Sequence, residues 1–129
     1  MTPDYEKAAA MAAQTLINYN ITSAPIDPLP ILKKIPGVLV MSFEDISKKV
    51  NLNREDVISM FGCDNQDAVT TVYMDRGELR YVVTYNRMLP SMIVDRVLAR
   101  ELGHIILGHD GSRQEDVRDA EARCFAKHL

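Results

Sequence analysis

The sequence lacks the features that would place it at a membrane or on a nucleic acid. Its longest apolar runs, such as GVLVM at 37–41, have the length of a core strand and are far too short to span a membrane. The formal net charge is −3, whereas nucleic-acid and anionic-membrane surfaces need clustered lysine and arginine. The beginning, MTPDYEKAAAM, has no basic segment followed by an apolar one, as a secretory signal would have. We therefore expect a cytoplasmic protein with neither a membrane nor a nucleic acid as partner.

Cysteine is also scarce, and so are signs of internal division. Only Cys63 and Cys124 occur, far apart and without a C-x-x-C pair, which is typical of an intracellular protein with reduced thiols. We interpret both as small buried side chains. There is no repeat, low-complexity segment or linker, and 129 residues that are 47% hydrophobic suffice for one core. The sequence thus predicts a single domain over residues 1–129.

The order of the predicted elements indicates an α+β domain. Thr2 and Asn53 are candidate helix caps, and glycine in the turn at 75–77 favours a hairpin. The predicted elements are a helix from residue 3 to about 18–20, a short helix at 30–35, a strand at 38–43, helices at 44–50 and 54–61, hairpin strands at 68–74 and 78–86, a helix at 91–107, a polar turn at 109–112, and a last helix from 114 to the end.

The predicted helix at 91–107 is mostly apolar but carries three ionisable residues on one sector. Arg100 and His104 are four residues apart, so they lie one turn apart and point the same way, with Glu101 beside them. Charged groups on a largely buried helix need partners. This sector is therefore the first candidate for a functional site.

The last predicted helix also carries a charged residue on its apolar face. Glu121 falls between Val117 and Cys124 on the apolar stripe of that helix. A carboxylate on the core side of a helix needs a metal, a cation or a hydrogen-bonded cluster. The alternative is that this end of the chain frays and that Glu121 is solvated.

These residues belong to motifs that resemble the ImmA/IrrE family of zinc metallopeptidases. The motifs are 94-VDRVLARELGHIILGHDG-111 and 119-DAEARCFAKHL-129, against a family pattern of roughly HELGHxxLxH, a spacer and ExEAxxFAxxLL. Upstream, 25-PIDPLPIL-32, the GVLV strand and a hairpin ending in Tyr-Asn occur in the family's order, so the resemblance spans nearly the whole chain.

Family members are intracellular proteins, frequent in mobile elements and prophages, that cleave repressor or regulator proteins. The resemblance therefore implies a zincin-like fold, in which a small sheet with a hairpin packs on the active-site helix. It also implies that the domain continues beyond residue 129.

The resemblance assigns roles position by position. His104 becomes a zinc ligand, Glu101 the general base that activates a zinc-bound water, and Glu121 the third protein ligand, with Asp119 as a less favoured substitute. This agrees with the chemistry of catalytic zinc, which takes three protein ligands and a water whose proton a neighbouring carboxylate accepts. His109 also matches a family position, but it lies five residues after His104, and we interpret it as a residue that contacts a ligand from behind or lies at the surface.

Arg100 departs from the family, because it stands where the first histidine belongs. A guanidinium has no lone pair to offer zinc. Alternatively, Arg100 supplies the positive charge itself and pairs with Glu121 or Glu101. Other groups that could complete a zinc site are Cys124, Asp119 and His128.

Two functions follow from this departure. The first is a zinc metallo-endopeptidase that cleaves a repressor-like regulatory protein despite Arg100. The second is a metal-free pseudopeptidase that binds a repressor-like partner through the old substrate groove.

The remaining signals are weaker. The segment 44–61 looks like a helix-turn-helix, but its four acidic residues outnumber its three basic ones, so DNA binding ranks third and packing on the sheet beside the site helix is expected. The resemblance to zincin-type folds implies that a strand edge above the site helix pairs with an extended substrate, and the second hairpin run, 78–86, is the natural candidate. A Cys124–His128 nucleophile is weighed against a structural cysteine, which we favour. We interpret the hairpin tyrosines as packing residues rather than a substrate channel; they are Tyr73, Tyr81 and Tyr85.

Overall fold

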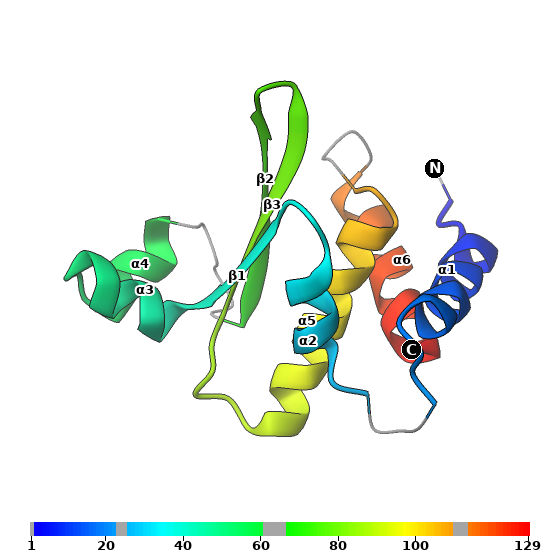
Figure 1. Ribbon diagram of the computed structural model, residues 1–129, viewed down its shortest axis with the longest axis horizontal. Coiled ribbons are helices and arrows are strands. Elements are labelled where there is room, and N and C mark those ends of the chain that lie inside the picture. Colours follow the sequence, from blue (N-terminus) through cyan, green and yellow to red (C-terminus); the bar gives the residue numbers. More distant parts are fainter. Residues whose placement is uncertain (1, 23–25, 61–66, 110–113) are drawn as a thin grey trace.

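The computed structural model describes residues 2–22, 26–60, 67–109 and 114–129. Within these ranges the chain forms six helices and a three-stranded sheet, so the predicted α+β class is confirmed (Figure 1). No described helix has the length and apolar character needed to cross a membrane. The elements are α1 (Tyr5–Asn18), α2 (Pro28–Lys34), β1 (Val38–Ser42), α3 (Phe43–Val50), α4 (Arg54–Met60), β2 (Ala68–Asp75), β3 (Glu78–Tyr85), α5 (Ser91–Ile106) and α6 (Glu115–His128).

The sheet is mixed and has the strand order β1-β3-β2. β1 runs parallel to β3, with Val38 opposite Tyr81, and β2 runs antiparallel to β3 from Ala68 opposite Tyr85 onward. The hairpin turn between β2 and β3 has two central residues, Arg76 and Gly77, both with positive φ. Such a turn matches the twist of the two strands it joins. β3 is therefore the central strand, and β1 and β2 are the edges.

Helices cover one face of the sheet in two layers (Figure 1). α5 packs on β2 and β3, which confirms the predicted packing of the hairpin on the site helix, and α2 packs on β1 and α5. α6 then packs on α5, and α1 on α6. Each fully buried leucine or phenylalanine in this core contributes about 1.5–3 kcal/mol. The core includes Leu32, Val83, Leu98, Leu102 and Phe125.

α5 and α6 approach closely because Gly103 has no side chain at their contact. A Cβ atom there would lie 3.1 Å from Phe125 Cδ1 and 3.2 Å from the backbone oxygen of Ala122. Both distances are tighter than ordinary van der Waals contact. The glycine of the ELGH motif thus brings α6 against α5 at the level of the ionisable residues.

Of three predictions at helix starts, two need correction and one is confirmed. Asp4, rather than Thr2, caps α1, because its carboxylate accepts the Lys7 N–H at 3.0 Å. α2 begins earlier than predicted, because Asp27 caps it and Pro28 fits its first turn, where a proline loses no helical hydrogen bond. The predicted cap Asn53 is confirmed, since its side-chain oxygen accepts the Asp56 N–H at 2.9 Å.

The α3–α4 pair packs on the sheet, as predicted, but on the face opposite α5. Phe43 and Val57 pack with Val69 of β2, and the side chains of a strand alternate between the two faces. The neighbouring Thr70 points to α5, so the expectation that this pair lies beside the site helix is wrong. Figure 1 shows α3 and α4 across the sheet from α5.

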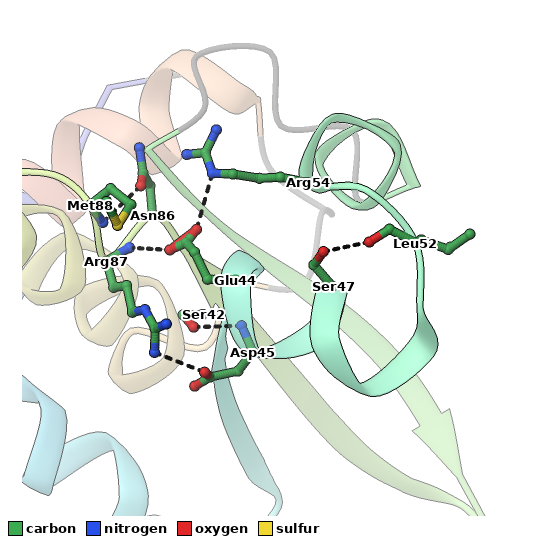
Figure 2. A network of polar contacts seen from close by, with 9 residues as sticks. All are labelled: Ser42, Glu44, Asp45, Ser47, Leu52, Arg54, Asn86, Arg87 and Met88. Atoms are coloured by element: carbon green, nitrogen blue, oxygen red, sulfur yellow. Dashed lines mark hydrogen bonds and ion pairs between the residues drawn. The ribbon is translucent and has the colours of Figure 1, made fainter.

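A surface network centred on Glu44 fixes α3 and α4 to the segment before α5 (Figure 2). Glu44 Oε1 accepts the backbone N–H of Arg87 at 2.9 Å, and Glu44 Oε2 lies 3.1 Å from Arg54 Nε. The Arg87 guanidinium also pairs with Asp45 at 2.9 Å. One carboxylate therefore links α3, α4 and the segment that leads into the site helix.

Candidate functional site

The end of α5 folds His109 back onto the site helix. Gly108 adopts a positive φ of 69°, and its N–H bonds the oxygen of Ile105 at 3.1 Å, while the His109 N–H bonds the oxygen of His104 at 2.9 Å. This pair of bonds is the Schellman ending of a helix, in which glycine takes the left-handed position. The residue after that glycine, here His109, is carried back over the last turn.

The imidazole of His109 then connects the two residues that the sequence singled out. His104 Nδ1 lies 2.8 Å from His109 Nδ1, and His109 Nε2 lies 2.9 Å from Glu121 Oε1. The two rings meet edge to face, with centroids 5.1 Å apart. His109 is 5% exposed, so the surface alternative for it is wrong, and the expected polar turn begins with a buried side chain.

Glu121 is buried and bonded through both oxygens. It is 2% exposed, so the alternative of a frayed, solvated end is wrong. While Oε1 faces His109, Oε2 accepts the backbone N–H of Asp4 at 2.6 Å. The carboxylate thereby ties the N-terminal segment, the end of α5 and α6 together.

Glu101 is buried at the junction of α5 and β2. It is 6% exposed, and its Oε2 accepts a short hydrogen bond from the Thr70 hydroxyl. Burial raises the pKa of Glu101, whereas the Thr70 hydroxyl and the charge of Arg100 act to lower it. The result is a carboxyl held against an edge strand with a weakened preference for its charged form.

His104 is neutral at physiological pH. Burial and the neighbouring His109 lower its pKa to about 4. Its outer nitrogen, Nε2, lies 3.5 Å from Asp119 Oδ1, whose side chain is 44% exposed. Asp119 therefore lies at the solvent side of the cluster, and His104 lies between Asp119 and the buried His109.

Arg100 is half-buried and lies near Glu101 and His104. Its charge acts on the pKa values of both Glu101 and His104. Nevertheless, it forms no ion pair with any residue that the structure describes. The expected Arg100–Glu121 or Arg100–Glu101 ion pair is therefore absent from the described part of the chain, and Glu121 bonds His109 instead.

The contacts that the structure shows for Cys124 and His128 are with residues other than His104. Cys124 is half-buried, and its Sγ lies 3.7 Å from the Tyr5 backbone oxygen and 3.7 Å from His128 Nδ1. His128 Nδ1 also lies 2.9 Å from the backbone oxygen of Cys124, a bond along its own helix. Cys63 lies outside the described residues. Cys124 and His128 thus interact with each other and with α1.

Two of the three hairpin tyrosines pack against the core, and the third is exposed. Tyr81 and Tyr85 pack against the main core, as predicted. Tyr73 is 45% exposed and lies opposite Arg80, so it packs against no other tyrosine across the strands. The three tyrosines therefore have different environments and do not form one packing cluster.

The strand predicted to pair with an extended substrate was the wrong one. β3 is bonded to β2 on one side and to β1 on the other, so residues 81–85 have no free edge. β2 is an edge strand, and its Thr70 bonds Glu101. Because β1 pairs with β3, the first hairpin strand, β2, is left at the edge of the sheet beside Glu101. This pairing is a long-range contact that the local sequence does not reveal.

The zinc ligand set that the resemblance implies does not fit this arrangement. A catalytic zinc needs three donor atoms at about 2.0–2.3 Å from one point. The imidazole of His109 stands between His104 and Glu121, both oxygens of Glu121 accept hydrogen bonds, and Arg100 offers no lone pair. These residues are committed to one another rather than to a common metal position.

Comparison of the chain with protein-family models, curated proteins and solved structures finds no match. The chemistry of the site is therefore argued from its own geometry. That geometry combines a neutral imidazole at His104, an exposed carboxylate at Asp119, and a buried carboxyl at Glu101 beside β2, an edge strand of the sheet that the described residues form.

Proposed function

We propose that this chain is a zincin-like domain of the ImmA/IrrE type that acts on a repressor-like regulatory protein by binding an extended segment of it. One observation carries the proposal: the edge strand β2 packs on α5 and bonds its Glu101 through Thr70. The glutamate of the ELGH motif and a free strand edge are thereby parts of one structural unit. The motifs quoted above supply the family and the class of partner.

The free edge of β2 suits such a partner. An edge strand presents unpaired backbone N–H and C=O groups, and an extended peptide can add to it as a further strand. Exposed side chains of β2, including Tyr73 and Met74 at 45% and 63% exposure, lie near the hairpin tip. They offer apolar contacts to a segment that runs along the strand.

Binding, rather than zinc-dependent cleavage, is the action that this site supports best. Arg100 removes one family ligand, and the bonds of Glu121 to His109 and Asp4 occupy a second. The same bonds hold the N-terminal segment, α5 and α6 together, so the helices behind β2 are fixed before a partner binds. Pre-organised surfaces lose less entropy when they bind a partner.

A second candidate is a metallo-endopeptidase that cleaves the same class of regulator. Glu101 favours it, because a buried carboxyl with a raised pKa suits a general base. This function requires a metal held by ligands other than the family's set.

The test uses purified chain and a panel of repressor-like proteins. Binding is measured by calorimetry, and cleavage by mass spectrometry, with Glu101→Gln as the catalytic control. Thr71→Lys on β2 places a charge at the proposed docking edge, and Leu39→Lys does so on the opposite edge strand, β1. We expect binding that Thr71→Lys weakens at least about tenfold, or about 1.4 kcal/mol, and that Leu39→Lys leaves unchanged.

Two results would decide otherwise. Cleavage that disappears in Glu101→Gln would establish the second candidate. If the chain bound no repressor-like protein, or if the two lysine variants behaved alike, docking at β2 would be refuted.

A further inference from the structure

Two arginine side chains, one from α5 and one from α6, lie near His104. Arg100 precedes His104 by one turn of α5, so the two side chains leave that helix on the same face. Arg118 precedes Ala122 by one turn of α6, and Ala122 is a residue against which Gly103 of α5 packs. The positive charges of both arginines act on the His104 imidazole. The close approach of α5 and α6 thus brings two cations to one place.

Neither guanidinium is neutralised within the part of the chain that the structure describes. Arg100 is half-buried and forms no ion pair with a described residue. Arg118 is also half-buried, and its buried Nε–H donates no hydrogen bond to any described residue. A partly buried charge is stabilised when an opposite charge or an acceptor reaches it. These two side chains therefore present positive charge that an anionic ligand can satisfy.

The carboxyl groups nearby limit the charge that such a ligand can carry. Asp119 follows Arg118 on α6, and its Oδ1 lies 3.5 Å from His104 Nε2. Burial raises the pKa of Glu101, which weakens the preference of that carboxyl for its charged form. Two guanidiniums and one exposed carboxylate leave about one excess positive charge, which a single carboxylate matches. A phosphate group carries nearly twice that negative charge and would be repelled by Asp119.

Arg100 also lies next to the strand at which docking is proposed. Its charge acts on Glu101, and Glu101 bonds the Thr70 hydroxyl of β2. A peptide strand that adds to β2 continues the pleat of the sheet, so every second side chain of the peptide points to the α5 face, as Thr70 does. A side chain of the docked segment can therefore reach the guanidinium while its backbone stays paired with β2.

We propose that Arg100 and Arg118 form a carboxylate-binding site that selects an acidic side chain in the peptide segment docked on β2. The inference rests on the proposed docking function and adds the chemistry that the segment must have. A guanidinium holds a carboxylate through two parallel N–H donors, which fixes its orientation as well as its charge. Arg100, whose charge acts on Glu101 beside β2, is the residue on which the selection chiefly depends, and Arg118 strengthens it from α6.

The test uses three capped synthetic peptides of alternating threonine and valine, which differ only in a central glutamate, glutamine or lysine. Their binding to the full chain is measured by calorimetry in about 0.1 M salt. We expect the glutamate peptide to bind at least about tenfold more tightly than the glutamine peptide, as for a hydrogen bond between charged groups. Acetate and inorganic phosphate are then compared as competitors, and acetate should displace the glutamate peptide at least as well as phosphate.

Variants of the arginines assign this preference to residues. Arg100→Gln should remove the preference for glutamate, and Arg100→Glu should transfer it to the lysine peptide. Arg118→Gln should reduce it. Arg123→Gln is the matched control, because Arg123 is an exposed cation on the same helix, and it should leave the preference unchanged. Circular dichroism of each variant separates a lost site from lost folding.

Four results would overturn the inference. Equal binding of the glutamate and glutamine peptides, weakened for both by Thr71→Lys, would leave docking at β2 in place and remove the carboxylate site. A preference for glutamate that survives in Arg100→Gln would assign it to another residue. Stronger competition by phosphate than by acetate would make the two arginines a phosphate site. Absence of binding of all three peptides to the folded, unmodified chain would refute the selection outright.

The docking function can also fail separately. If the glutamate preference depended on Arg100 but Thr71→Lys left the affinity unchanged, the two arginines would remain a carboxylate site and docking at β2 would be refuted.

Discussion

Two glutamates each stand at the centre of a polar network in the described part of the chain, and the two networks are built differently. Glu44 accepts a backbone N–H from Arg87 and pairs with the Arg54 guanidinium, at the surface of the α3–α4 pair (Figure 2). Glu121 accepts a backbone N–H from Asp4 and contacts the His109 imidazole, in the interior between α1, α5 and α6. Their side chains are 12% and 3% exposed.

The difference between the two networks lies in where they lead. The Glu44 network ends in arginine side chains, whose protons are permanently bound, and its parts hold segments in place. The Glu121 network continues through His109 to His104, whose outer nitrogen meets solvent-side Asp119. The Glu44 network, which ends in permanently charged arginines, supports the fold. The Glu121 network reaches two imidazoles, which are groups that can gain or lose a proton.

The largest effect should come from removing the buried carboxylate. Glu121→Ala leaves the buried His109 ring and the partly buried N–H of Asp4 without this partner, and each such loss costs about 1–3 kcal/mol. We expect a loss of about 3 kcal/mol in the free energy of unfolding, measured by urea denaturation. Glu44→Ala is the matched variant and should cost about 1 kcal/mol. Equal losses would remove the distinction between the two networks.

The next effect tests how α5 and α6 are held together. Gly103→Ala places a methyl group 3.1–3.2 Å from Phe125 and Ala122, so the helices must separate. We expect a loss of about 2 kcal/mol, as for overpacked cores, in thermal or urea unfolding.

Gly108→Ala provides the comparison for that substitution. Its added Cβ meets nothing within 4 Å, but its φ is +69°, so we expect about 1 kcal/mol from the backbone alone. If Gly103→Ala cost no more than Gly108→Ala, close packing would not explain the glycine of the motif.

The pH dependence of stability should have opposite signs at two residues three positions apart on α5. Burial raises the pKa of Glu101 above its ordinary value of 4.5, so the fold is favoured at low pH and loses this stability as pH rises through the raised value. The pKa of His104 is lowered from 6.5 to about 4, so its contribution is complete above about 6.5 and is lost as pH falls toward 4.

Glu101→Gln and His104→Gln separate these contributions. In metal-free buffer, Glu101→Gln should gain stability relative to the unmodified chain as pH rises from about 4 to 7. His104→Gln should gain relative stability as pH falls over the same interval. Urea unfolding at several pH values measures both, and slopes of the same sign in the two variants would contradict the assigned environments.

The smallest effect should come from the Glu44–Arg54 ion pair itself. The two side chains are 12% and 27% exposed, and a double-mutant cycle with alanine should give a coupling of less than about 1 kcal/mol. The coupling should shrink further in about 1 M salt, because salt screens charges near the surface. A salt-independent coupling well above this value would place the pair among buried interactions.

Much of the fold could be predicted from local patterns. Periodicity and turn residues gave every helix and strand of the described chain to within a few residues, because these elements are specified by neighbours in sequence. The parallel pairing of β1 with β3 could not be predicted in this way, since it joins segments more than forty residues apart. The choice of sheet face for α3 and α4 depends on the same kind of long-range contact.

The candidate site could also be predicted only where local spacing determines it. The burial of Glu121 and the common sector of Glu101 and His104 followed from helical spacing. The place of His109 was missed because it was judged by its spacing of five residues from His104, although Gly108 is a signal for a Schellman ending that turns the chain back. The Asp4 contact had no signal at all, because a backbone N–H carries no sequence identity.

The most direct test is the hydrogen bonding of the His109 ring, observed in a long-range proton–nitrogen-15 NMR spectrum at about pH 7. Because the His109 ring contacts both His104 and Glu121, Glu121→Gln should shift the ring-nitrogen signals of both histidines, while Glu44→Gln should leave them unchanged. Ring-nitrogen signals of His104 that Glu121→Gln leaves unchanged would contradict the connection of Glu121 to His104 through His109.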